Sequence, residues 1–209
     1  MLNRLKKLKE KLGLKKTDPL DEEFDLVYPM INTVEGFLKS PKQERWFFGA
    51  AKTAPKNAVI VEIGSFKGRS TVSFGFGCVG TQKHIYAIDL FEGDGKDYGE
   101  GDFQKVFQEN IDRCGLTACI TAIKKHSLEV ASTWNKPIDI LFIDGSHEYN
   151  DVKADFEAFY PHVKKNGIIA FHDIKGKWDG VIKFWGEVLT AGYLKDVGKV
   201  SSLGFGRKK

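Results

Sequence analysis

The sequence predicts an α/β fold in which helices cover both faces of a mostly parallel β-sheet. Two observations carry this prediction. From residue 58 onward, short apolar runs rich in β-branched residues alternate with longer segments of helical character, a pattern typical of βαβ units. The apolar runs also lack the strict polar–apolar alternation of a sheet with one wet face, so both faces of the sheet should be buried.

The predicted elements follow one another in a regular order. Strands are expected at 58–63, 85–88, 119–123, 138–143 and 168–171. Helices are expected at 70–78, 102–114, 128–134, 149–163 and 181–191. Two further runs, 197–201 and 203–206, lie close enough in sequence to form an antiparallel hairpin at one end of the sheet.

A helical lead-in over residues 21–52 precedes this core, which spans 58–207. The helical pattern breaks near Ser40, which has the character of a helix N-cap, and Pro41 suits the first helical position. Gln43 occupies the capping-box position. A chain of 209 residues has room for one substantial core, so we expect residues 17–209 to form a single domain.

Charge is distributed unevenly along the chain. The formal charge is +4, but residues 1–16 alone hold seven basic side chains and one acidic one. Leu2, Leu5, Leu8 and Leu12 lie at helical spacing there, which indicates a basic amphipathic N-terminal arm. Such an arm suits packing on the domain or on a partner subunit of a homo-oligomer, or peripheral contact with an anionic membrane surface.

The rest of the chain is acidic, which bears on its partners and compartment. Residues 17–206 carry 22 basic and 27 acidic side chains, so we expect no nucleic-acid partner despite a pI near 8.8. No apolar run approaches the ~18–20 residues that span a bilayer, and the N-terminus lacks the apolar stretch of a signal peptide. The three cysteines lack metal-binding spacing, which fits reduced core thiols and a cytoplasmic protein.

A glycine turn follows the first strand, in the segment VEIGSFKGRST. Gly64 and Gly68 permit tight backbone geometry and close approach of a ligand. Ser70 and Thr71 open the next helix, whose free N–H groups favour an anionic or hydroxyl-rich partner. Glu62 is an acid at the end of an apolar strand, a position that is costly without a partner.

A second acid, Asp89, ends the next strand, where a carboxylate suits hydrogen bonding to the ribose hydroxyls of a nucleoside cofactor. An NAD site uses the same architecture. However, the turn is G-S-F-K-G and not G-x-G-x-x-G, and Glu62 would repel a diphosphate. Glu62 favours instead a cofactor that carries a cationic amine and a sulfonium.

Three segments of the sequence resemble a known family. VEIGSFKGRST, IYAIDLFEGD and IDILFIDGSHEYNDVKADFEAFYPHVKKNGIIAFHDI are similar to class I S-adenosylmethionine-dependent methyltransferases, in particular to the subgroup of macrocin-type sugar O-methyltransferases and cephalosporin-hydroxylase-like proteins. The resemblance covers about residues 33–207. It implies a Rossmann-like, seven-stranded, mostly parallel sheet with an antiparallel last strand, which agrees with the expected hairpin.

The resemblance also implies a cofactor site for S-adenosylmethionine. Glu62 and the two glycines would face its methionine part, Asp89 its ribose, and Ser127, which follows the third strand, its adenine. The residues expected to bind the cofactor are Glu62, Gly64, Ser65, Gly68, Ser70, Thr71, Asp89, Ser127 and Asp144.

Acids and histidines follow the fourth and fifth strands: Asp144 and His147, then His172 and Asp173. Parallel strands end at one rim, so we expect these side chains to gather above the cofactor crevice. Two carboxylates with imidazoles fit a divalent-cation site, and the resemblance implies magnesium held by Asp144 and Asp173. His172 stands where the family often has an acid, so it is either a third ligand that favours Mn²⁺ or an orienting residue behind the ligands.

His147 is the candidate general base, because a neutral imidazole near pH 7 suits removal of a hydroxyl proton; a structural residue at a helix start is the alternative. Trp178, Phe184 and Trp185 are expected to form a wall of the acceptor pocket. For segment 92–102 the sequence leaves two interpretations open, a lid over the site and an ordinary surface loop.

The sequence thus predicts an S-adenosylmethionine-dependent O-methyltransferase that acts on a hydroxyl of a sugar, a glycan precursor or another small metabolite, with a divalent metal (Mg²⁺ or Mn²⁺). Two alternatives stay open. One is a different enzyme on the same fold, hydroxylase-like or NAD-dependent. The other is a non-catalytic binding protein associated with a membrane or a complex.

Overall fold

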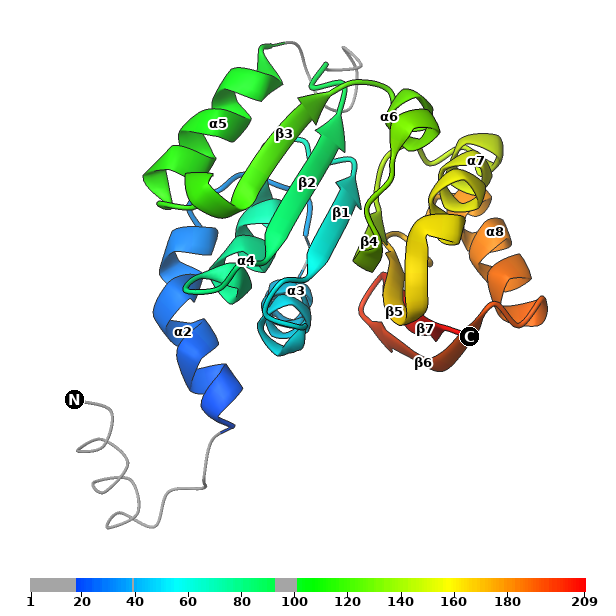
Figure 1. Cartoon of the computed structure of the whole chain (residues 1–209), viewed down its shortest axis with the longest axis horizontal. Helices are drawn as coiled ribbons and strands as arrows, with labels where there is room; N and C mark the ends of the chain where they lie inside the picture. The colour runs from blue at the N-terminus through cyan, green and yellow to red at the C-terminus, as the bar shows by residue number, and fades with distance from the viewer. Residues whose placement is uncertain (1–17, 39, 93–100) are drawn as a thin grey trace.

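The computed structural model describes residues 18–38, 40–92 and 101–209. In this part of the chain one sheet has the strand order β3-β2-β1-β4-β5-β7-β6 (Figure 1). The strands are β1 (Val59–Ile63), β2 (His84–Asp89), β3 (Ile120–Lys124), β4 (Ile138–Ile143), β5 (Val163–Phe171), β6 (Leu194–Val200) and β7 (Leu203–Lys208). The helices are α2 (Pro19–Ile31), α3 (Pro41–Thr53), α4 (Arg69–Cys78), α5 (Phe103–Arg113), α6 (Ser127–Thr133), α7 (Tyr149–Phe159) and α8 (Asp179–Thr190), with short 3-10 turns at Thr117–Cys119 and Tyr160–His162.

Strands β1 to β5 pair in parallel, whereas β7 is antiparallel to both β5 and β6. The predicted Rossmann-like sheet with an antiparallel last strand and a terminal hairpin is therefore confirmed. The first strand along the chain, β1, lies in the middle of the sheet. Strands β2 and β3 add outward on one side of it, and β4 then pairs with β1 on the other side. That reversal leaves a crevice at the carboxyl ends of β1 and β4, the place where α/β sheets of this kind bind ligands.

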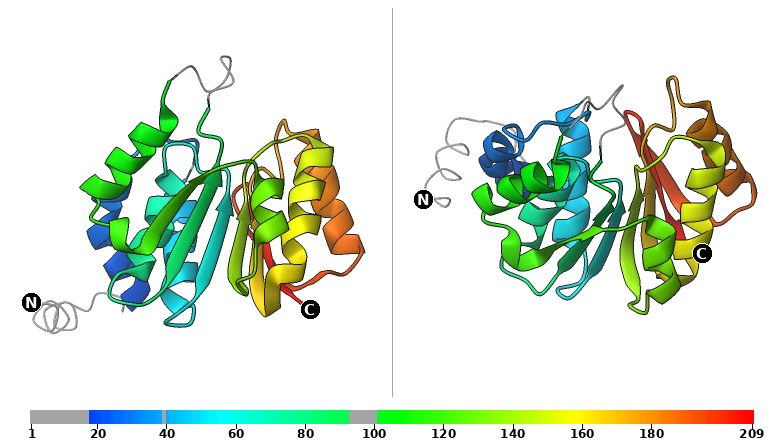
Figure 2. Two further views of the ribbon diagram at one scale, coloured as in Figure 1. Left: turned by 45° about the horizontal axis from the view of Figure 1, so that its top comes forward. Right: turned by 90° about the horizontal axis from the view of Figure 1, so that it is seen from above.

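Helices cover both faces of the sheet, as Figure 2 shows. The layer of α2, α3, α4 and α5 meets one face, where the rings of Phe47, Phe74 and Phe142 lie 4.8–6.1 Å apart. The layer of α6, α7 and α8 meets the other face around Phe156 and Phe171. Each fully buried aromatic or aliphatic side chain contributes roughly 1.5–3 kcal/mol, so these two clusters hold the strand ends in fixed positions.

The lead-in forms two helices; the second begins as the sequence predicts, and the first begins at Pro19, two residues before the predicted start. Ser40 caps α3, since its hydroxyl accepts a hydrogen bond from the backbone N–H of Lys42 at 3.3 Å, and Pro41 is the first helical residue. Asp18 caps α2 in the same way.

Two predicted boundaries are wrong by four residues or more. The helix expected to reach residue 163 ends at Phe159, because Pro161 has no N–H with which to continue it. Strand β5 begins at Val163 and not at 168, and its register against β4 shifts where Asn166 adopts a φ of 63°. The first residues of β5 include two lysines and an irregular register, so they lack the apolar pattern by which a strand is predicted from sequence.

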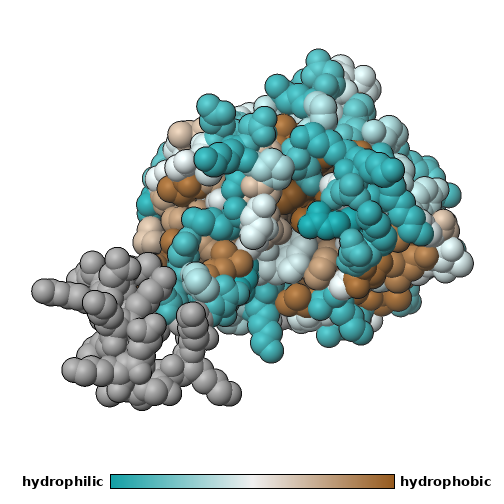
Figure 3. All heavy atoms as spheres, turned by 60° about the horizontal axis from the view of Figure 1, so that its bottom comes forward, coloured by the Kyte–Doolittle hydropathy of each residue, from teal (hydrophilic) through white to brown (hydrophobic). Residues whose placement is uncertain are grey.

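Hydrophobic surface lies in separate patches between polar side chains on the face shown in Figure 3. Among the described residues, the most exposed large apolar side chain is Leu26 of α2, at 70%. In the described ranges no helix combines the length and hydrophobicity needed to cross a bilayer. The predicted basic arm, 1–16, and most of the predicted lid, 92–102, lie outside the described residues.

Candidate active site

A cavity of about 350 Å³ opens at the carboxyl ends of the central strands. Its walls come from the glycine turn after β1, the ends of β2 to β5, and the loop between α2 and α3. The predicted site residues that line it are Gly64, Ser65, Ser70, Asp89, Ser127, Asp144, His147, His172 and Asp173. The other three, Glu62, Gly68 and Thr71, do not line the cavity but shape the turn behind its wall.

Gly64 joins the ends of β1 and β4. It has a φ of +84°, and an added Cβ would lie 2.1 Å from the carbonyl oxygen of Asp144. The Asp144 N–H donates to the carbonyl of Ile63 at 2.8 Å across the same junction. Since any other residue would be both strained and blocked here, Gly64 fixes the floor of the cavity against Asp144.

Glu62 supports the turn from beneath. Its carboxyl group is fully buried, and Oε2 accepts hydrogen bonds from the hydroxyls of Ser65, at 3.1 Å, and Thr71. Oε1 has no hydrogen-bond partner among the described residues. Burial raises the pKa of Glu62 to about 7 despite the hydroxyl hydrogen bonds, which lower it. A buried acceptor that lacks a donor is costly, and a ligand group can satisfy it.

Asp89 ties the turn to the end of β2. Its Oδ2 accepts from the backbone N–H groups of Ser65, at 2.6 Å, and Phe66, at 2.8 Å, while Oδ1 accepts from that of Phe91 at 2.6 Å. Phe66 and Phe91 both have positive φ. A carboxylate offers about four acceptor positions, so Asp89 both shapes the turn and keeps capacity for one more donor from the cavity.

The acids and histidines after β4 and β5 converge as the sequence predicts. Each of Asp144, His147 and Asp173 offers one ligand atom, and these three atoms lie within 4.8 Å of one another. His147 Nε2 is 3.2 Å from Asp173 Oδ2. This trio is the group in the described residues whose spacing fits a metal ion; it contains His147 and not His172.

His172 lies directly behind the two carboxylates and is only 5% exposed. Its Nδ1 is 3.3 Å from Asp144 Oδ1 and 3.4 Å from Asp173 Oδ2. Its Nε2 faces the amide Nε2 of Gln43 at 3.1 Å and the hydroxyl of Ser202 at 3.3 Å. With both ring nitrogens directed at protein groups, His172 has the geometry of an orienting residue; its role as a metal ligand stays a prediction.

Charges in this cluster reinforce one another. Burial lowers the pKa of His172, but the charge and hydrogen bond of Asp144, together with Asp173, raise it to about 10. Although burial raises the pKa of Asp173, hydrogen bonds from His147 and His172 hold it well below its usual range. A protonated His172 therefore lies between the two carboxylates and keeps Asp173 ionised.

His147 is held by an aromatic plane as well as by Asp173. Its ring stacks on Trp178 with centroids 4.0 Å apart and planes at 9°. Of the three aromatics expected in the acceptor wall, Trp178 alone is near the rim. Phe184 and Trp185 are 5% and 8% exposed and pack on Phe171 beneath the sheet, so that expectation is wrong for both, because the apolar face of α8 turns to the core.

Comparison with known proteins decides the family. Residues 61–174, more than half of the chain, match a family model described as a methyltransferase domain. The chain belongs to this methyltransferase family. The match runs from β1 to the loop after β5, and so includes the glycine turn, Asp89 and the rim.

Relatives and solved structures agree with this assignment. The methyltransferase is 29% identical over 137 residues to protein y4gI of Sinorhizobium fredii, covering 62% of this chain and 15% of that protein. It is 25% identical over 134 residues to O-methyltransferase hkm8 of Aspergillus hancockii, covering 64% of this chain and 49% of that protein. The chain thus spans half or less of these relatives. An O-methyltransferase from Bacillus cereus, solved in complex with SAH, has the same fold, with a TM-score of 0.64, 15% identity and coverage of 99% and 97%.

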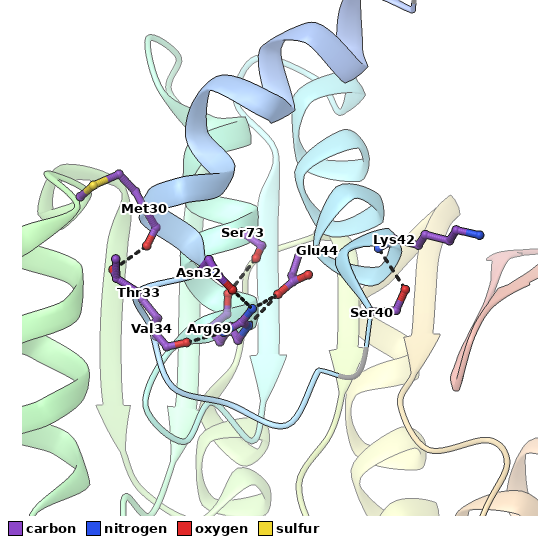
Figure 4. A network of polar contacts seen from close by, with 9 residues as sticks. All are labelled: Met30, Asn32, Thr33, Val34, Ser40, Lys42, Glu44, Arg69 and Ser73. Atoms are coloured by element: carbon purple, nitrogen blue, oxygen red, sulfur yellow. Dashed lines mark hydrogen bonds and ion pairs between the residues drawn. The ribbon is translucent and has the colours of Figure 1, made fainter.

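Arg69 connects the lead-in to the glycine turn of the methyltransferase, a link that sequence patterns do not reveal. It donates to Glu44 Oε1 at 2.6 Å, to the carbonyl of Val34 at 2.7 Å and to Asn32 at 3.1 Å. Figure 4 shows these groups converging on the guanidinium from α3 and from the loop that follows α2. Since Arg69 and residues 35–38 both line the cavity, this network fixes the lead-in as one wall of the site.

An aromatic cluster at the cavity and a buried acid also went unpredicted. The rings of Phe37 and Phe66 are 5.3 Å apart, and those of Phe66 and Phe103 are 5.0 Å apart; all three residues line the cavity. Phe66 lies inside the G-S-F-K-G turn, which was a visible signal. Asp155 of α7 lines the cavity beside Ser127, and a single acid on a predicted helix gave no such signal.

Proposed function

We propose that the protein transfers a methyl group from S-adenosylmethionine to a hydroxyl of a sugar or another small metabolite, with the help of a divalent metal. The convergence of Asp144, His147 and Asp173 within 4.8 Å, in the same cavity as the glycine turn, carries this proposal. The O-methyltransferase names of the fungal and bacterial proteins above support it. The sugar subgroup rests on the sequence resemblance alone.

The residues of the turn fit this cofactor. Asp89 lines the cavity, and its spare acceptor capacity suits a ribose hydroxyl. Glu62 is fully buried behind the wall and keeps the turn in shape through the hydroxyls of Ser65 and Thr71. When bound, S-adenosylmethionine supplies an electrophilic methyl group on a sulfonium. An acidic crevice stabilises that positive charge, whereas it would disfavour a diphosphate.

The rim fits a divalent metal. Carboxylate oxygens are the ligands that Mg²⁺ and Mn²⁺ prefer, and Asp144 and Asp173 would hold the ion while the N–H of His172 keeps them aligned. A metal bound there would lower the pKa of an acceptor hydroxyl and fix its direction.

His147 then acts as the general base. Asp173 accepts a hydrogen bond from Nε2 and Trp178 stacks on the ring, so the imidazole is held in one orientation. His147 would then take up the proton that the acceptor hydroxyl loses when it is methylated.

Three variants separate the roles of base and ligand. Mn²⁺ binding to the SAH-loaded protein is measured by electron paramagnetic resonance, and methyl transfer to polyol and catechol acceptors by SAH release. Asp144→Asn should weaken Mn²⁺ binding at least tenfold, by analogy with the loss of a metal contact. His147→Ala should retain Mn²⁺ and lose turnover by about 100-fold or more. His162→Ala, a histidine of the turn after α7, should change neither.

Two outcomes would contradict the proposal. Mn²⁺ that fails to bind the wild-type protein removes the metal. Unchanged turnover in His147→Ala removes the base, whereas loss of Mn²⁺ in that variant makes His147 a ligand.

A further inference from the structure

Asp155 is a buried acid that the proposed reaction leaves without a task. It lies on α7, is 5% exposed and lines the cavity. Its Oδ1 accepts a hydrogen bond from the hydroxyl of Ser127 at 2.5 Å. Among the described residues no lysine, arginine or histidine forms an ion pair with it, and burial raises its pKa to about 6. A buried carboxylate supported by a neutral hydroxyl is costly unless it has a further donor.

Asp155 lies at the end of the cavity next to β3, together with Ser127. Beside β4 and β1 the cavity is lined by Gly64 and Asp144, and beside β2 by Asp89. The next strand outward is β3, which leads into Lys125 and Ser127. If the methionine group lies over β1 and the ribose at Asp89, the nucleobase reaches Ser127 and the carboxylate behind it.

Gly145 leaves that carboxylate open to the cavity. An added Cβ at Gly145 would lie 3.4 Å from Ile63 Cγ2 and 3.7 Å from Asp155 Oδ2. The space that a side chain at position 145 would fill therefore lies in front of Asp155 Oδ2. Leu90, an apolar side chain that is 46% exposed, also lines the cavity. A flat base fits the combination of a glycine, an apolar side chain and an acid at its edge.

We propose that Asp155 selects the nucleobase of the cofactor by accepting a hydrogen bond from the exocyclic amino group of adenine. An ionised carboxylate accepts hydrogen bonds and cannot donate one. It therefore favours the 6-amino group of adenine and repels the 6-carbonyl oxygen of hypoxanthine. This inference rests on the proposed function, because it needs the cofactor in this cavity.

The test compares S-adenosylhomocysteine with S-inosylhomocysteine by isothermal titration calorimetry. The wild-type protein should prefer the adenosyl compound by about 10- to 100-fold, the range for a hydrogen bond to a charged group. Asp155→Asn should weaken binding of the adenosyl compound about tenfold and nearly abolish the preference, since an amide can donate to the carbonyl. Asp139→Asn is the matched control: Asp139 is a buried acid that pairs with Lys164 outside the cavity, and its loss should leave the preference unchanged.

Gly145→Ala tests the same contact without removing the acid. The backbone at Gly145 is not left-handed and its Cβ contacts are of ordinary length, so the variant should fold while binding the adenosyl compound more weakly. Equal affinity of the wild-type protein for the two compounds would overturn the inference and leave the proposed function standing. So would an intact preference in folded Asp155→Asn. Binding of neither compound to the wild-type protein would overturn the proposed function itself.

Discussion

Glu62 stabilises the free protein in its protonated form, and this makes stability depend on pH. In the folded chain burial raises its pKa from an ordinary 4.5 to about 7. The folded state therefore keeps a proton that the unfolded chain releases between pH 4.5 and 7. The contribution to stability is fully present below pH 4.5 and is lost as the pH rises through 7. At 1.36 kcal/mol per pKa unit, the loss between pH 5 and pH 8 is about 2 to 3 kcal/mol.

Glu62→Gln should remove this dependence, because glutamine keeps an acceptor for the hydroxyl of Thr71 and does not titrate. Urea unfolding followed by tryptophan fluorescence, without ligand, gives the free energy of unfolding at pH 5, 6, 7 and 8. Relative to the wild type, the variant should gain about 2 to 3 kcal/mol across this range. Glu129→Gln, at an exposed position of α6, controls for the loss of one negative charge. Parallel pH profiles of wild type and Glu62→Gln would refute the protonated, buried state of Glu62.

Three substitutions test the scaffold around the site by the same unfolding assay. Gly64→Ala should destabilise the protein by about 3 kcal/mol or more, through backbone strain and a clash of the added Cβ. Gly80 has a similar φ but open space around it, so Gly80→Ala should cost only about 1–2 kcal/mol. Equal losses in the two variants would contradict the clash. Lys83→Met should cost about 1–3 kcal/mol, because Nζ donates to carbonyls at the ends of α3 and α4, and a neutral result would mean that water satisfies them. Arg69→Met should cost about 3–5 kcal/mol of stability, because it leaves Glu44 buried and unpaired. Adding Glu44→Met to this variant should recover part of the lost stability. A double variant no more stable than Arg69→Met would contradict the energetic role of the Arg69–Glu44 ion pair.

Sequence patterns predicted the fold because apolar β-branched runs are a local property. They predicted the rim because Asp89 ends a strand, Asp144 and Asp173 come just after strands, and parallel strands end together. The 28 positions between Asp144 and His172 were no obstacle, because topology rather than proximity in sequence brings the two together.

The contacts that patterns missed depend on packing between layers. Gln43 has the spacing of a capping-box residue, yet its amide meets His172 across 129 positions. Asp155 has the look of an ordinary polar position in a helix, and only the packing of α7 on α6 sets it against Ser127. Phe184 and Trp185 follow the rim in sequence, but the rotation of α8 buries them. Such positions depend on which helix face meets the sheet.

Calorimetric titration of the purified chain with S-adenosylhomocysteine and, separately, with NAD tests the central claim most directly. The geometry of the glycine turn, Glu62 and Asp89 predicts saturable binding of one S-adenosylhomocysteine per chain, weakened in Asp89→Asn, and no saturable binding of NAD. Saturable NAD binding, or no saturable binding of S-adenosylhomocysteine, would contradict the account.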